Sequence, residues 1–163
     1  MYIEFIAAAG ACHARLRQVA EDPGAEADLD AVTRAALNDA GIYEARERLF
    51  IDASTAVAGA GQAMFERLRA LQRAVAAGAS LTSTAFHDAY HPYIGAVWEY
   101  RVAVRKELEG RSLSPAAFGW EAWDGTGRCL TCRQAAPSAP DAGPGQTPNS
   151  TTPAATDPAT APP

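Results

Sequence analysis

The chain lacks the clustered positive charge that nucleic-acid binding requires. Its 14 cationic residues, of which Lys106 is the single lysine, are outnumbered by 19 acidic ones, and the net charge is −5. Neutralising a phosphate backbone takes a basic patch, whereas these arginines alternate with acids, as at Arg46–Glu47–Arg48. The sequence therefore predicts no nucleic-acid partner. Scarce lysine beside abundant Ala, Gly and Pro indicates GC-rich coding and a bacterial source.

Long apolar runs are also missing. No stretch reaches the roughly 20 residues that span a bilayer, which excludes a membrane-spanning helix. The first residues, MYIEFIAAAGAC, contain Glu4 and have no basic residue ahead of the apolar run, unlike an export signal. We expect a soluble cytoplasmic protein, and a secreted helical effector is the alternative that finding the protein outside the cell would favour.

Catalytic and cofactor motifs are absent as well. There is no Gly-rich phosphate loop, no G-x-S-x-G or H-E-x-x-H motif and no Glu-x-x-His pair of a helical di-iron site. Three cysteines, an odd number, do not form a disulfide framework in a cytoplasmic protein. We therefore expect no enzyme, no identifiable small-molecule substrate and no established cofactor.

What the sequence does contain is helical periodicity. Apolar residues recur at spacings of three and four from Tyr2 to about Glu21, which predicts a first helix with one buried stripe. A seven-residue repeat then runs from about 28 to 76 and predicts one long, coiled-coil-like helix with a bend near 58–61. A third helix is expected from about 84 to Glu109, kinked or restarted at Pro92 because proline removes a backbone hydrogen bond.

The predicted fold is all-α. Short loops join the two shorter helices to the long one, so we expect an elongated antiparallel bundle of three helices, which a break at 58–61 would convert into a bundle of four. The helical bundle domain covers 1–110, and a docking segment with a Trp pair and a CxxC motif covers 111–133. Residues 134–163 hold eight of the 11 prolines and no large apolar side chain, and we expect them to form a disordered tail.

The CxxC motif is the one candidate site. Cys129 and Cys132 have the spacing at which two thiolates grip one Zn²⁺, but a structural zinc ion needs four ligands and no second CxxC exists. His87 and His91, four residues apart on a predicted helix, would share one face if the helix continues through Pro92. These four residues could together form a Cys2His2 zinc site.

Other uses of these thiols stay open. The alternatives are zinc with other ligands or with a second chain, a redox dithiol, a reversible local disulfide, and two exposed thiols without a role. A catalytic dithiol normally lies at a helix N-terminus beside a βαβ unit, and no strand is readable here. Cys12 belongs to the first apolar stripe and is expected to be a core residue, with His13 at its boundary.

The long seams, small residues and missing catalytic motifs favour a non-enzymatic interaction or scaffolding module. Its expected partner is another protein or a second copy of the chain, since three helices seldom cover every apolar side of a fifty-residue helix. The alternative is a metal-binding or thiol redox-sensing protein that uses Cys129 and Cys132.

Overall fold

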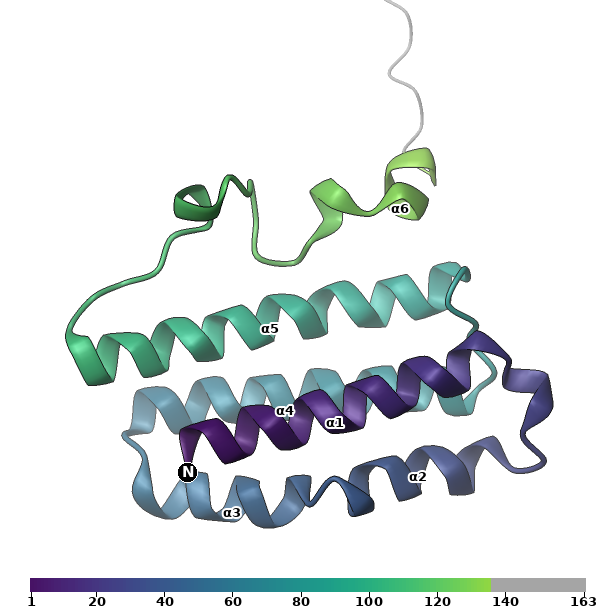
Figure 1. The fold of residues 1–163 in the computed structure, drawn as a ribbon, viewed down its shortest axis with the longest axis horizontal. Coiled ribbons are helices and arrows are strands. Elements are labelled where there is room, and N and C mark those ends of the chain that lie inside the picture. Colours follow the sequence, from purple (N-terminus) through teal and green to yellow (C-terminus); the bar gives the residue numbers. More distant parts are fainter. Residues whose placement is uncertain (136–163) are drawn as a thin grey trace, which may run out of the picture.

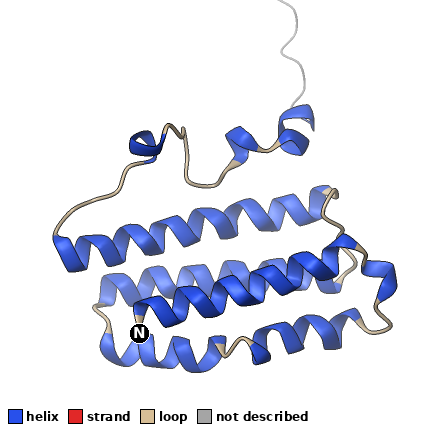
Figure 2. Ribbon diagram, viewed as in Figure 1, coloured by secondary structure: helices blue, strands red, loops and turns tan. Residues whose placement is uncertain are grey.

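The computed structural model describes residues 1–135, and every regular element in that range is helical (Figures 1 and 2). This confirms the all-α prediction. The predicted tail lies outside the described residues from residue 136 onward. The elements are α1 (Tyr2–Glu21), η1 (Pro23–Ala25), α2 (Leu29–Asp39), α3 (Ile42–Asp52), α4 (Thr55–Ala76), α5 (Thr84–Glu109), η2 (Pro115–Phe118), η3 (Thr126–Arg128) and α6 (Leu130–Ala135).

Four antiparallel rows of helix form the bundle. Helices α2 and α3 lie end to end and make one row, and α1, α4 and α5 make the others (Figure 1). The four-helix version of the predicted architecture is therefore the one that forms. None of the described helices is long and apolar enough to cross a membrane.

The long second helix is where the sequence prediction was wrong. The chain leaves the helix at Gly41, whose φ of 64° is left-handed and suits glycine. It reverses at Ala53 and Ser54, and the Ser54 hydroxyl then caps α4 by accepting a hydrogen bond from the Val57 N–H. The bend expected at 58–61 does not occur, because these residues lie inside α4.

Gly61 serves close packing rather than bending. A Cβ built on this residue would overlap the Leu49 Cδ2 atom of α3. The missing side chain leaves room for the buried Leu49 side chain at this point. The seam residues on both sides of the reversal thus pack face to face instead of continuing along one helix.

The predicted stripe of α1 packs against buried aromatic residues of α5. Aromatic side chains fill the space between these two helices: the Tyr93 hydroxyl donates to the Ala9 carbonyl over 3.2 Å, and the Tyr100 hydroxyl donates to the Tyr2 carbonyl over 3.1 Å. Fully buried residues from every row complete the core, among them Phe5, Leu16, Leu37, Leu49, Met64, Leu68 and Leu71.

Helix α5 is continuous through Pro92, so the expected restart of the helix at this residue does not occur. It begins at the Ser83 cap, whose hydroxyl accepts from the Phe86 N–H, and ends at the left-handed Gly110. Pro92 and Asp88, whose carbonyl loses its helical donor to the proline, both lie on the exposed side. Water can solvate that carbonyl, so the helix persists. As a result, His87 and His91 lie one turn apart on a single face.

The segment after Gly110 doubles back along α5 (Figure 1). Trp123 stacks on Trp98 of α5 with ring centroids 4.5 Å apart. Further along, a Cβ on Gly95 would meet the Asp124 Cβ at 3.6 Å, so the segment lies close to the helix there. This path brings the cysteines to the first half of α5.

Candidate metal centre

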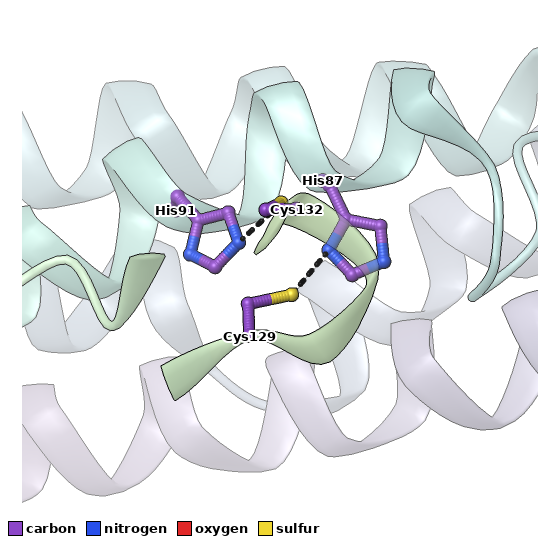
Figure 3. A group of neighbouring side chains, drawn as sticks. All are labelled: His87, His91, Cys129 and Cys132. Carbon is purple, nitrogen blue, oxygen red and sulfur yellow. Dashed lines mark hydrogen bonds between the residues drawn. The ribbon is translucent and has the colours of Figure 1, made fainter. Parts of the chain in front are cut away.

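The structure brings together the four residues that the sequence singled out. His87 and His91 of α5 face Cys129 and Cys132 of the returning segment (Figure 3), and their four donor atoms lie within 4.8 Å of one another. His91 Nε2 is 3.2 Å from the Cys132 sulfur, and His87 Nδ1 is 3.4 Å from the Cys129 sulfur. Two thiols and two imidazoles thus converge on one point.

These separations suit a tetrahedral zinc ion. Zinc–sulfur bonds of about 2.3 Å and zinc–nitrogen bonds of about 2.0 Å at tetrahedral angles place neighbouring donors roughly 3.3–3.8 Å apart. The two nitrogen–sulfur distances of 3.2 and 3.4 Å are within a few tenths of an ångström of that range. The widest separation in the group, at most 4.8 Å, would have to shorten by about 1 Å to complete the coordination.

The ring of His91 is already oriented for metal binding. Its Nδ1 lies 2.7 Å from the backbone carbonyl oxygen of Asp124. A carbonyl oxygen can only accept, so Nδ1 carries the proton, and in the neutral ring Nε2 presents its lone pair toward Cys132. A ligating histidine typically donates its other N–H to a carbonyl or carboxylate in this way. The sequence did not point to Asp124, because a backbone acceptor leaves no residue signature.

His87 completes the imidazole pair. Its ring lies 5.6 Å from that of His91, tilted by 30°, and its Nδ1 faces Cys129 (Figure 3). The other nitrogen, Nε2, is buried without a hydrogen-bond partner among the described residues. The polar edge of His87 that has a partner is therefore the one turned toward the sulfur.

A tight turn presents the two cysteines. The Asp124 carboxylate accepts hydrogen bonds from the Thr126 N–H over 3.0 Å and the Thr126 hydroxyl over 2.8 Å, and Gly125 adopts the left-handed φ of 73° that the turn requires. The Cys129 N–H then bonds to the Thr126 carbonyl. Cys132 lies in the first turn of α6, so both sulfurs reach the same side.

The electrostatics favour one thiolate. A hydrogen bond from the Cys132 backbone lowers the pKa of Cys129 to about 7, and burial offsets part of this effect. Burial and the neighbouring Cys129 raise the pKa of Cys132. Near neutral pH the Cys129 thiol is thus the more readily deprotonated of the two.

The remaining titratable candidates lie elsewhere. Cys12 is fully buried, and burial raises its pKa to about 12, as expected for a core thiol. His13 is half-buried against Tyr90 and Tyr93, with ring centroids 5.6 and 5.2 Å away, which agrees with its predicted boundary position. Neither belongs to the four-residue group.

An aromatic cluster beside the site was only partly foreseen. The sequence predicted a docking segment with a Trp pair, Trp120 and Trp123, but it did not identify the residue of the bundle that they contact. This residue is Trp98 of α5, which is half-buried and contacts both tryptophans and Phe118.

Comparison of the chain with family models, with curated proteins and with solved structures finds no match.

Proposed function

We propose that this protein binds one Zn²⁺ ion through His87, His91, Cys129 and Cys132, and that the ion fastens the C-terminal segment to the helical bundle. The observation that carries the proposal is the convergence of four donor atoms within 4.8 Å from two segments that are 37 residues apart. Helix spacing explains the histidine pair and the turn explains the cysteine pair, but neither alone explains why the pairs meet.

The donor set favours zinc and a structural role. Two thiolates and two imidazoles suit a borderline-soft ion, whereas magnesium and calcium prefer oxygen ligands. Four protein ligands close the tetrahedron and leave no position for a substrate or an activated water. We therefore propose a structural zinc ion in a non-enzymatic protein.

Apart from the packing of its aromatic residues on Trp98, the segment that the ion would hold has little regular structure. Between Gly110 and Cys129 its only regular elements are two short 3₁₀ turns, and α6 has six residues. Without metal, the same four side chains would be joined by two thiol–imidazole hydrogen bonds, which are weak. Because structural zinc contributes its binding free energy to ordering the chain, the ion would change a loosely held segment into a fixed one.

Metal analysis tests the proposal. Protein purified without chelator is compared with the double variant Cys129→Ser/Cys132→Ser and with Cys12→Ala, a matched control that removes the one thiol outside the group. We expect close to one zinc per chain in the wild type and the control, and none in the double variant. Substoichiometric zinc in the wild type after zinc addition and gel filtration would contradict the proposal.

We also propose that the helical bundle self-associates and in this way acts as an interaction module. An apolar groove of about 340 Å³ lies between α1 and α5, and the side chains of Ile3 and Leu108 on its rim are 80% and 65% exposed. Exposed apolar side chains of this size lose water when a second copy covers them. Sedimentation should show concentration-dependent association that Ile3→Glu weakens. A strict monomer at high micromolar concentration would contradict this.

A further inference from the structure

One of the two sulfur-bearing residues of the four-residue group lies in the wall of a surface pocket. The pocket has a volume of about 350 Å³, and its wall is formed by Tyr90, His91, Ile94, Asp124, Gly125 and Cys129. Cys129 and Cys132 are both half-buried, in contrast to the fully buried Cys12. A small solute can therefore reach Cys129 from solvent without opening the helical bundle.

The two cysteines are also placed to react with each other. Only two residues separate Cys129 from Cys132 in the chain, and their sulfurs lie within 4.8 Å. A disulfide requires the sulfurs to be about 2 Å apart, and cysteines with this spacing form one in the Cys-x-x-Cys motifs of thiol oxidoreductases. Cys12 is buried in α1 and does not belong to the group. The pair that can oxidise is therefore Cys129 with Cys132.

The origin of the four donors decides what such a disulfide would do to the C-terminal segment. Both histidines belong to α5, and both cysteines belong to the returning segment (Figure 3). A zinc ion bonded to all four residues joins the segment to the helix. A disulfide joins the cysteines only to each other, and it removes the thiolates, which are the form of cysteine that binds a metal. Oxidation would thus break the connection to α5 without replacing it.

We propose that the four-residue group is a redox switch, in which a peroxide oxidises Cys129 and Cys132 to a disulfide and thereby releases the zinc ion and frees the C-terminal segment from α5. This inference rests on the proposed zinc site and adds the regulation of that site. Zinc holds the segment in the reduced protein, and the same two sulfurs that bind the ion respond to the oxidant.

The reaction is a two-electron oxidation in which hydrogen peroxide accepts the electrons. The Cys129 thiolate attacks one peroxide oxygen, the O–O bond breaks, and a sulfenic acid and a hydroxide ion form. The Cys132 thiolate then attacks the Cys129 sulfur, the S–S bond forms, and a second hydroxide ion leaves. Two protons from the buffer convert both hydroxide ions to water. The zinc ion retains only two imidazole ligands and dissociates.

Intrinsic fluorescence can follow the segment, because all three tryptophans of the chain lie where it contacts α5. Trp123 stacks on Trp98 with ring centroids 4.5 Å apart, and Trp120 lies edge-on to Trp98 at 4.8 Å. Separation of the segment from the helix would expose these rings to water. Oxidation should therefore shift the emission to longer wavelength and increase acrylamide quenching severalfold.

Three measurements on the zinc-loaded protein during treatment with hydrogen peroxide test the switch. A chromophoric chelator reports released zinc, mass spectrometry identifies the disulfide, and fluorescence reports the position of the segment. We expect one zinc ion to be released for each disulfide between Cys129 and Cys132. A phosphine reductant with added zinc should restore the original fluorescence.

Two variants keep the result specific. Cys12→Ala retains all four ligands and should respond to peroxide as the wild type does. Cys129→Ser/Cys132→Ser should have the fluorescence of the oxidised wild type before peroxide is added, and peroxide should not change it further. A peroxide response of the same size in this double variant would overturn the inference.

The zinc content before oxidation separates this inference from the zinc proposal. One zinc per chain that peroxide does not release, or that leaves without a disulfide between these two cysteines, overturns only the switch. Zinc release with unchanged tryptophan fluorescence also overturns it, because the segment then stays on α5. A reduced protein that takes up no zinc defeats the zinc proposal and the switch together.

Discussion

The Asp124 carbonyl oxygen lies 2.7 Å from Nδ1 of His91 and fixes which nitrogen of that ring is free. The ring is buried, and its other nitrogen faces the Cys132 sulfur over 3.2 Å. A residue of the returning segment thus orients a side chain of α5 for a second residue of the same segment. The turn that carries Asp124 and the cysteine pair act as one unit.

Substitutions at these two positions should differ in strength. His91→Ala removes a ligand, and we expect zinc affinity to fall more than about 100-fold. Asp124→Ala keeps the backbone carbonyl but loses the turn bonds to Thr126, so a decrease of roughly 10-fold is expected, as for a supporting contact. Competition with a chromophoric chelator measures both. Equal affinities of His91→Ala and wild type would rule out His91 as a ligand.

The number of cysteines that a thiol reagent modifies should depend on zinc and on folding, because the three side chains differ in burial. Cys12 is fully buried, whereas Cys129 and Cys132 are only half-buried. We expect a thiol reagent to modify no cysteine rapidly in the zinc-loaded protein, two after chelation and all three after denaturation. The helical circular dichroism signal should persist on chelation, because most of the bundle core is remote from the four ligands. Two rapidly reacting thiols before chelation would contradict zinc coordination.

The first helix and the four donor residues could be predicted from the sequence. The stripe from Phe5 to Val19 is followed by Pro23, and its residues are the ones that α1 buries, so local pattern and tertiary packing agree. The prediction that His87 and His91 share one face depended on whether the helix continues through Pro92. An exposed proline in a helix with a buried opposite face does not break it, because packing outweighs the lost hydrogen bond.

The reversal between α3 and α4 was harder to foresee. The apolar repeat continues across residues 53–54 without interruption, and a hairpin uses the same seam as a straight helix. The Ser54 cap is the local signal, but serine also occurs inside helices. The contacts of Asp124 with His91 and of Trp98 with Trp123 depend on how the returning segment crosses α5, which residue spacing does not encode.

Two glycines of α4 should respond oppositely to alanine. Gly59 has no atom within 4 Å of a Cβ built on it, so Gly59→Ala should raise the free energy of unfolding by about 0.5–1 kcal/mol through helix propensity. At Gly61 the new methyl group would overlap Leu49, and overpacking of a core costs about 1–3 kcal/mol. Urea denaturation of both variants measures the difference. Equal stabilities would show that the Leu49 side chain does not pack tightly against Gly61.

His13 should make the bundle acid-sensitive. Burial, assisted by Arg17, lowers the pKa of His13 from 6.5 to about 4. Between these values the unfolded chain binds a proton that the folded chain does not, so stability is complete above pH 6.5 and falls as the pH decreases toward 4. The difference between the two pKa values sets an upper limit of about 3 kcal/mol on this loss of stability. The loss itself is smaller, because the ring is only half-buried and water screens its charge. His13→Phe keeps an aromatic ring against Tyr90 and Tyr93 but cannot titrate. Thermal melts of both proteins should therefore diverge below pH 6.5, with the variant less affected, and parallel curves would show that His13 does not govern the acid response.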